Sequence, residues 1–326
     1  MNVHAHRAIR PQPITMTSQP NQPGGPTDSA LNICIAVQEP NRLGESPVWH
    51  PAENVLYWCD IPAHRLYQLD PHTARVRHWQ FETDVACCAP MSGGGLLLGM
   101  RDGLWRFDVQ TAQRTLLAAP PYEPSRERFN DGKCDPQGRF WVGTIYEPRD
   151  PPLAHLYCYT QGQLTRRESG ITTSNGLAWT VDSRTMYWSD TKAHTIYALD
   201  FAPETGMTSN RRVFATFPAK EAGQNLVDYG GRPDGAAMDA EGCYWVALFE
   251  GQRVLRLSPQ GEVLREVRLP VRCPTMPCFG GHDLKTLYIT TAREGRPAPE
   301  LAEQPHAGCV LSLRVDTPGL PANFFC

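Results

Sequence analysis

The chain repeats one kind of segment six times, and this repetition limits its possible folds more than any other feature. Each segment contains a short apolar run with an aromatic or aliphatic pair, a turn or loop, and a second alternating run. A period of two, with many β-branched and aromatic residues, indicates two β-strands joined by a turn. The segments are VLYWCDIPAHRLYQLD (55–70), LLLGMRDGLWRFD (96–108), RFWVGTIYEPRDPPLAHLYCY (139–159), TMYWSDTKAHTIYALD (185–200), CYWVALFEGQRVLRL (243–257) and TLYITTAREG…GCVLSLRVD (286–316).

The spacing of these segments predicts how they are arranged. One residue of each apolar pair serves as a marker, and successive markers lie 40 to 57 residues apart. Repeats of this length that contain several short strands are typical of a β-propeller, in which each repeat forms one blade. Six markers therefore predict an all-β, six-bladed β-propeller. The markers are Trp58, Leu98, Trp141, Trp188, Trp245 and Tyr288.

The two ends of the repeat region predict how the ring closes. A strand-like segment, LNICIAVQE (31–39), precedes the first full repeat, and the last repeat is one strand short. We expect 31–39 to be the outer strand of the sixth blade, so that residues 31–326 form a single propeller domain. Residues 1–30 are rich in Pro, Gln, Ser and Thr and lack the apolar core of a secretory signal, which predicts a disordered leader.

Composition excludes some classes of partner. The chain is 41% hydrophobic and 20% charged with a net charge of −3, which offers no electrostatic attraction to nucleic acid or to anionic membranes. No apolar run reaches the roughly 20 residues of a membrane span. The 11 cysteines form no CxxC pair and no zinc-type pairing with histidine, so we expect reduced thiols in a cytoplasmic protein. Protein partners and oligomeric state cannot be read from the sequence.

Alignment of the repeats brings polar residues to one place. The first strand of each blade lies nearest the propeller axis, so equivalent positions of the first strands meet at one rim of the channel. Counting back 11 residues from Trp141 and Trp245, or 13 from Trp58 and Trp188, leads to a polar residue each time. The two-residue difference keeps the side chains on one face, and we attribute it to a longer hairpin loop. The four residues are Glu45, Asn130, Asn175 and Asp234.

Two carboxylates and two amides around one axis predict a site for one hard divalent cation. Without a cation, Glu45 and Asp234 would repel each other in a partly buried channel. The cation could be calcium, magnesium, manganese, ferrous iron or zinc, and the sequence does not choose among them. The alternative for Asp234 is structural, because Asp-Gly in RPDGAAMD (232–239) is also a common turn dipeptide.

Five motifs resemble the SMP-30/gluconolactonase/regucalcin family. They are GESPVWHPAENVLYWCDIP (44–62), RFNDGKCDPQGRFWVGT (128–144), SNGLAW (174–179), RPDGAAMD (232–239) and PTMPCFGG (274–281). The resemblance covers residues 40–316 and implies a six-bladed propeller that holds one divalent cation in its channel and hydrolyses a sugar lactone, such as a glucono-, arabinono- or xylonolactone.

The resemblance also implies a role for each site residue. Its metal ligands fall on Glu45, Asn175 and Asp234, and its lactone-binding residues fall on Arg128 and Asn130. A further substrate-binding glutamate has its counterpart in Glu147, although EPRD (147–150) stands where the family pattern has a pair of carboxylates. We expect Asp234 to accept the proton of the attacking water and Arg128 to bind substrate oxygens.

Other functions remain open. One alternative is a related propeller hydrolase that acts on phosphotriesters or other esters, and another is a non-catalytic, calcium-binding propeller. Serine hydrolysis is not supported, because the chain has no GxSxG motif. We expect Asp60 and Asp190, which follow the YW pairs, to brace the structure. For Asp131, beside the predicted site, a supporting role and a turn role are equally open.

Overall fold

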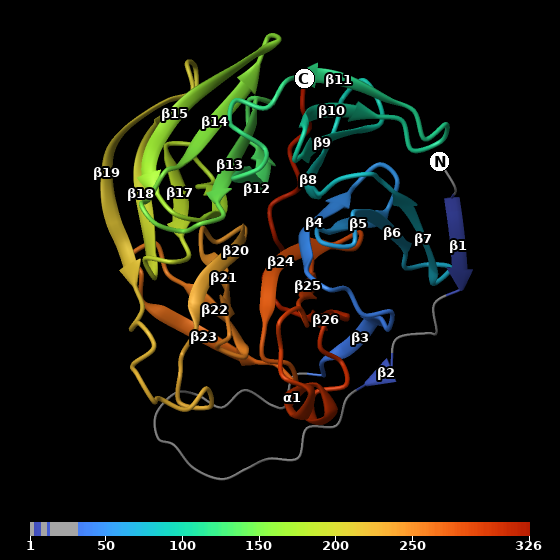
Figure 1. The fold of residues 1–326 in the computed structure, drawn as a ribbon, viewed down its shortest axis with the longest axis vertical. Helices are drawn as coiled ribbons and strands as arrows, with labels where there is room; N and C mark the ends of the chain where they lie inside the picture. The colour runs from blue at the N-terminus through green and yellow to red at the C-terminus, as the bar shows by residue number, and fades with distance from the viewer. Residues whose placement is uncertain (1–2, 8–11, 14–31) are drawn as a thin grey trace.

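The computed structural model describes residues 3–7, 12–13 and 32–326, and it is an all-β propeller with six blades around a central axis (Figure 1). Each blade is an antiparallel sheet whose first strand is innermost. These first strands contact one another in sequence around the ring, and the first strand of the sixth blade contacts that of the first. The predicted fold class is confirmed.

The first three blades follow one another along the chain. Blade 1 contains β4 (Gly44–His50), β5 (Val55–Asp60), β6 (Arg65–Asp70) and β7 (Arg75–Gln80). Blade 2 contains β8 (Val85–Pro90), β9 (Leu96–Met100), β10 (Gly103–Phe107) and β11 (Arg114–Ala118). Blade 3 contains β12 (Glu127–Cys134), β13 (Phe140–Tyr146), β14 (Ala154–Thr160) and β15 (Gln163–Ile171).

The remaining blades complete the ring. Blade 4 contains β16 (Ser174–Trp179), β17 (Thr185–Asp190), β18 (Thr195–Ala202) and β19 (Met207–Thr216). Blade 5 contains β20 (Arg232–Met238), β21 (Tyr244–Phe249), β22 (Arg253–Leu257) and β23 (Val263–Arg268). Blade 6 contains β24 (Pro274–Gly280), β25 (Thr286–Thr291), β26 (Val310–Arg314) and β3 (Cys34–Val37), and a short helix, α1 (Ala298–Glu303), precedes β26.

The ring closes where the sequence predicts. β3 pairs with β26 in antiparallel register, with Val37 opposite Val310, so residues before the first blade complete the last one. Every marker lies in the second strand of its blade, and residues 217–231 form a long loop between blades 4 and 5. The predicted leader falls mainly outside the described residues. Within it, β1 (Val3–Arg7) pairs with β7 and β2 (Gln12–Pro13) pairs with β3.

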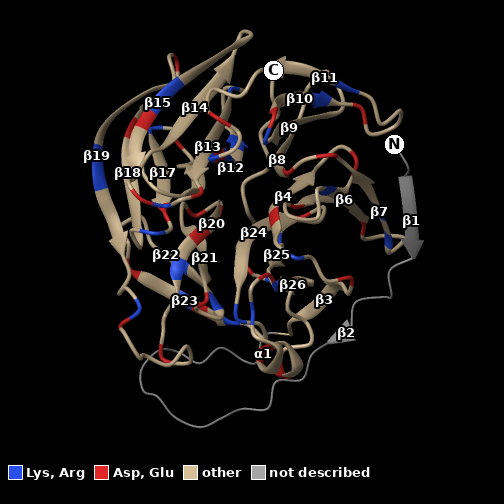
Figure 2. Cartoon of the chain, viewed as in Figure 1, with Lys and Arg blue, Asp and Glu red and all other residues tan. Residues whose placement is uncertain are grey.

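Burial decreases from the axis outward. The innermost strands are almost wholly buried, whereas β19 and β23 at the outer edges are largely exposed. The apolar cores lie between neighbouring blades, as where Trp141 of blade 3 packs against Trp179 and Phe201 of blade 4. Charged side chains of both signs are interspersed over the blades (Figure 2). In the described part of the chain, no helix is long and apolar enough to span a membrane.

The C-terminal residues 317–326 form a strap across one end of the channel. The amide of Leu320 donates to the carbonyl of Met238 in blade 5, and the amide of Phe325 donates to the carbonyl of Pro90 in blade 2. The amide of Cys326 donates to the carbonyl of Gly138 in blade 3. The strap therefore connects blades on opposite sides of the axis.

Removal of β3 should weaken the whole domain. A chain that begins at Pro40 lacks β3, whereas a control chain that begins at Asn32 keeps it. Ile33 and Val37 are each 2% exposed. Burial of such a side chain contributes about 1.5–3 kcal/mol, so we expect the shorter chain to lose about 3–6 kcal/mol of unfolding free energy in urea titrations. Equal stabilities of the two chains would show that the sixth blade closes without β3.

Candidate active site

The predicted site residues meet at one end of the channel. Glu45, Asn175 and Asp234 lie near the beginnings of β4, β16 and β20, and Arg128 and Asn130 lie near the beginning of β12. All five side chains are buried. The structure thus brings together every predicted site residue except Glu147, which lies at the edge.

A local irregularity of the inner strands points these side chains toward the axis. In each of these four strands, the register with the second strand shifts at the site residue, as between Glu45 and Val48 and between Pro233 and Ala236. The same shift follows Asn175 and spans Asn130. A β-bulge leaves extra residues unpaired and changes the direction of a side chain. The bulges therefore explain why polar side chains turn into the channel here.

The turn interpretation of the Asp234–Gly235 dipeptide is wrong, because both residues lie within β20. Gly235 has a packing role instead. A Cβ atom at this position would lie 2.4 Å from Cβ of Met276 in the next blade. Gly176, which follows Asn175, has φ +64°, a conformation that favours glycine, and a Cβ there would lie 2.3 Å from the hydroxyl of Tyr244. Glycine beside these two site residues thus permits close packing of the inner strands.

The predicted reason for the two offsets from the markers is also wrong. The hairpin loops 51–54 and 135–139 differ by a single residue. The offsets differ because Trp58 is the fourth residue of β5, whereas Trp141 is the second residue of β13. The two tryptophans also have different partners, since the indole of Trp58 donates to Asn41 and that of Trp141 donates to Asp135. The alignment reached the site because the shift is one full strand period.

A chain of hydrogen bonds links the site residues of three blades. Arg128 donates to Oδ1 of Asn130 at 2.9 Å, and Nδ2 of Asn130 donates to Oδ1 of Asn175 at 2.9 Å. Nδ2 of Asn175 donates to Oδ1 of Asp234 at 2.6 Å and to Oγ1 of Thr191 at 2.7 Å. The positions of these side chains are therefore mutually dependent.

Burial dominates the electrostatics of the site. Burial, together with the charges of Asp234 and Asp131, raises the pKa of the Glu45 carboxyl well above its ordinary value. Burial raises the pKa of Asp234 to about 8, although the charge of Arg232 opposes this shift. Burial also lowers the pKa of the Arg128 guanidinium. Each group has lost more hydration than its neighbours replace, which is typical of functional sites.

The donor set fits a hard divalent cation. Glu45 accepts a hydrogen bond from the amide of Ser46, and Asp234 accepts one from Asn175, so neither buried carboxylate has a basic side chain as hydrogen-bonding partner among the described residues. Within the same part of the chain, no three His, Cys, Asp or Glu side chains form a metal-binding cluster. Any cation here would therefore be held by two carboxylates with amide oxygens. Asn175 turns its nitrogen to Asp234, and ligation through its oxygen would require the amide to rotate.

Glu147 belongs to an ion-pair network beside the site. Arg101 donates to both carboxylate oxygens of Glu147, at 2.8 and 3.0 Å, and also pairs with Asp84 at 2.6 Å. These hydrogen bonds lower the pKa of Glu147. Nε of Arg128 lies 3.7 Å from Glu147. Sequence reasoning missed Asp84 and Arg101, because no motif or repeat position distinguishes them.

Three aspartates hold the site from behind. Asp60 accepts the amides of Arg42 and Leu43, just before Glu45, and Asp190 accepts those of Thr172 and Thr173, just before Asn175. The expected bracing by the two YW aspartates is therefore observed, at the segments that connect blade 6 to blade 1 and blade 3 to blade 4. Asp131 accepts the amide of Leu177 in the next blade, and burial raises its pKa. This contact favours the supporting role over the turn role.

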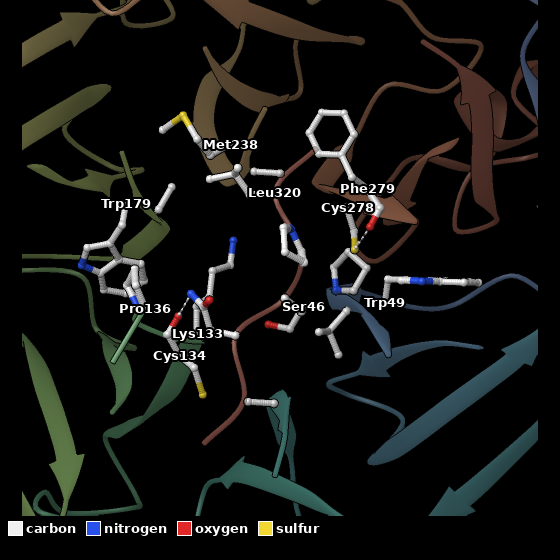
Figure 3. Close-up of a pocket in the computed structure, with 18 of the residues that line it drawn as sticks. Ser46, Trp49, Lys133, Cys134, Pro136, Trp179, Met238, Cys278, Phe279 and Leu320 are labelled. Atoms are coloured by element: carbon white, nitrogen blue, oxygen red, sulfur yellow. Dashed lines mark hydrogen bonds between the residues drawn. The ribbon is translucent and has the colours of Figure 1, made fainter. Parts of the chain in front are cut away.

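The cavity of about 250 Å³ in the channel does not coincide with the site residues. It lies between the bulges and the C-terminal strap and is lined mainly by apolar side chains from the ends of the inner strands. Trp49 and Trp179 lie on opposite sides of it, with Lys133 between them and Leu320 of the strap beside Met238 (Figure 3). Nζ of Lys133 donates to the carbonyl of Ala236 at 2.7 Å. The two ends of the channel therefore differ in polarity.

Comparison with known proteins identifies the family. Residues 43–293 match the model of the SMP-30/gluconolactonase/LRE-like region. The chain is 43% identical to a 6-deoxy-6-sulfogluconolactonase of Pseudomonas putida, over 90% of this chain and 97% of the relative. It is 36% identical to regucalcin of Danio rerio, over 87% of this chain and 95% of the relative. The protein belongs to the SMP-30/gluconolactonase/LRE-like family.

A solved structure agrees with this assignment. The crystal structure of a calcium-binding protein, regucalcin, from Agrobacterium tumefaciens matches with a TM-score of 0.84 and 25% sequence identity. The match covers 90% of this chain and 96% of that structure. The predicted family resemblance is thus confirmed over nearly the whole propeller.

Loss of the Asp190 carboxylate should destabilise the domain. Asp190 is 4% exposed, and Asp190→Ala would leave buried backbone amides of Thr172 and Thr173 without an acceptor. We expect a loss of about 1–3 kcal/mol in unfolding free energy, measured by urea titration. Asp108→Ala is the matched control, because exposed Asp108 also accepts two amides, those of Gln110 and Thr111. An equal effect of both substitutions would contradict a bracing role for Asp190.

Proposed function

We propose that the protein is a divalent-cation-dependent hydrolase of sugar lactones. The observation that carries this proposal is the convergence of Glu45, Asn130, Asn175 and Asp234 beside Arg128 at one end of the channel. The gluconolactonase family and the sulfogluconolactonase relative make the chain a hydrolase of carboxylic esters. The particular lactone and the particular cation are proposals for experiment.

Arg128 and Asn130 bind the substrate in this proposal. One terminal nitrogen of Arg128 donates to Oδ1 of Asn130 and to the carbonyl of Phe129, which fixes the plane of the guanidinium. Its other nitrogens can donate to the hydroxyl oxygens of a sugar lactone, since a guanidinium has five donors in a rigid arrangement. Glu147 borders the same space, where it can accept a hydrogen bond from a substrate hydroxyl.

Asp234 accepts the proton of the attacking water. Asp234 is buried beside Asn175 at the site, and one of its carboxylate oxygens takes the proton. The water oxygen bonds to the lactone carbonyl carbon, the ring C–O bond breaks, and the released ring oxygen takes the proton that Asp234 received, which restores the carboxylate. The product is the open-chain hydroxy acid, and the ester is cleaved without any covalent bond to the protein.

Glu45, Asn175 and Asp234 would hold the cation. When bound, it would polarise the lactone carbonyl and make water a better nucleophile. Oxygen ligands of this kind suit calcium, magnesium, manganese and ferrous iron, and zinc also binds open sites with oxygen ligands. The regucalcin relative is described as calcium-binding, which favours a non-catalytic calcium-binding propeller as the second candidate. A cytoplasmic location is part of the proposal and agrees with eleven unpaired cysteines.

Activity should require both a cation and Asp234. We would measure acid release from a panel of aldonolactones by metal-stripped protein, with and without each divalent cation, above the spontaneous rate. We expect one cation to restore activity, and Asp234→Asn to lower kcat at least 100-fold, in line with loss of a general base. Asp182→Asn, in an exposed turn, is the control. Tight cation binding without hydrolysis of any lactone would favour the second candidate.

Substitution of Arg128 should affect substrate binding most. We expect Arg128→Ala to raise KM about tenfold or more through loss of charge-assisted hydrogen bonds, with a smaller change in kcat. Arg128→Lys keeps the charge but not the forked arrangement of donors. Its KM should therefore lie between those of the unsubstituted protein and Arg128→Ala. Near-ultraviolet circular dichroism would check that the variants retain the native packing. Unchanged steady-state kinetics of Arg128→Ala on every lactone hydrolysed would remove this residue from the substrate site.

A further inference from the structure

An exposed loop near the site carries an arginine that, among the described residues, no carboxylate neutralises directly. Arg149 lies in the exposed loop after β13, and its guanidinium has no hydrogen bond or ion pair with any residue that the structure describes. The nearby arginines differ in this respect, since Arg101 pairs with Asp84 and Glu147, and Arg232 pairs with Glu250. Arg149 is therefore available to a ligand.

The charge of Arg149 reaches the site. It contributes to the lowered pKa of Glu147, the substrate-binding residue predicted at the edge of the site. This effect connects Arg149 with the ion-pair network of Glu147 and Arg101. Arg149 thus lies close enough to the edge of the site to act on Glu147 electrostatically.

The backbone holds Arg149 in an unusual conformation. Its φ is +62°, in the left-handed region that costs energy for residues other than glycine. Its amide donates to the carbonyl of Tyr146 at 2.8 Å, and its carbonyl accepts a hydrogen bond from Nζ of Lys192. Because the backbone is already fixed, a ligand that binds this arginine would have to order only the side chain.

Lys192 brings a second positive charge to the same place. It is exposed and follows Thr191, whose Oγ1 accepts the hydrogen bond from Asn175 of the site. The amide of Lys192 is held by Asp190, the aspartate that braces blade 4. A continuous set of contacts therefore connects Asn175, through Thr191 and Lys192, to the backbone of Arg149.

Two positive charges beside the site would attract an anionic ligand more strongly than a neutral one. We propose that Arg149, with Lys192, binds an anionic substituent, a sulfonate or a phosphate, on the lactone at the end remote from the reacting carbonyl. Arginine and lysine both recognise such oxyanions, and arginine does so with paired donors. This inference rests on the proposed lactonase function and names its substrate class. The sulfonated lactone in the name of the Pseudomonas putida relative agrees with it.

The test compares three lactones that differ at one position. They are glucono-1,5-lactone, 6-phosphogluconolactone and 6-deoxy-6-sulfogluconolactone, assayed with the cation that supports activity. We expect a higher kcat/KM for at least one anionic lactone than for the neutral one. Arg149→Gln should reduce kcat/KM for the anionic lactone about tenfold or more, mainly by raising KM. Arg149→Lys should retain part of the preference, and Arg166→Gln, an exposed arginine on outer strand β15 of the same blade, should retain all of it.

Two further measurements separate the possible failures. The preference should decline as salt rises, because exposed charges are screened over about 8 Å at physiological ionic strength. Thermal stabilisation by 6-phosphogluconate should exceed that by gluconate, and Arg149→Gln should abolish the difference. If the variant weakens both product acids equally, Arg149 binds the new carboxylate and the inference is wrong.

The panel also distinguishes this inference from the proposed function. Hydrolysis of all three lactones with equal efficiency, unaffected by Arg149→Gln, would overturn the inference and leave the lactonase function standing. If the protein hydrolysed neither these three lactones nor any other lactone, whichever cation was supplied, both the inference and the proposed function would be overturned.

Discussion

The site depends on one constraint, which is that six inner strands must pack around a common axis. Side chains that turn toward this axis are buried together whatever their chemistry. The register shifts near the beginning of the inner strands occur at one level of the channel, and four of the six are accompanied by a carboxylate or amide side chain. A bulge redirects a side chain without breaking the sheet. The fold therefore supplies the convergence, and the sequence supplies the chemistry at each of the six positions.

Convergence has an electrostatic consequence that the rest of the site must offset. Glu45, Asp131 and Asp234 are all buried, and burial raises the pKa of each carboxyl. Burial of like charges is costly unless a cation or donors compensate. Arg128 and the asparagine amides provide part of that compensation, and the bracing aspartates Asp60 and Asp190 fix the backbone on which these groups stand. A hard cation would complete the compensation, which is why the donor set favours one.

The sequence predicted the architecture well because each blade of a propeller corresponds to one repeat along the chain. Strand segments at regular spacing identify the six blades, and the unpaired segment 31–39 predicts the closing strand β3 that pairs with β26. Alignment of the repeats also predicted Glu45, Asn130, Asn175 and Asp234, because these residues occupy repeated positions. The explanation of the 11- and 13-residue offsets from the marker tryptophans was wrong. A tryptophan two residues further along a strand lies on the same face, so the sequence alone does not distinguish the two positions.

Residues outside the repeat could not be predicted in this way. Asp84 and Arg101 come from different loops and meet Glu147 only in the folded protein. The partners of Asp131 were equally hidden, since its contact with Leu177 crosses from one blade to the next. No local pattern encodes such contacts, because each depends on the angle between neighbouring blades. The sequence therefore reveals the residues on the inner strands but not the network that orients them.

The two ends of the channel differ in role: one contributes to stability, and the other carries the polar site residues. At one end the strap 317–326 ties together blades 2, 3 and 5 over a mainly apolar cavity, so that end contributes stability. At the other end the polar residues lie beneath the loops that follow β13 and β17, which carry Arg149 and Lys192. These loops are free to vary because the inner strands already hold the reacting groups. Relatives with the same inner-strand residues can therefore differ in substrate, and the entrance loops are where such differences would arise.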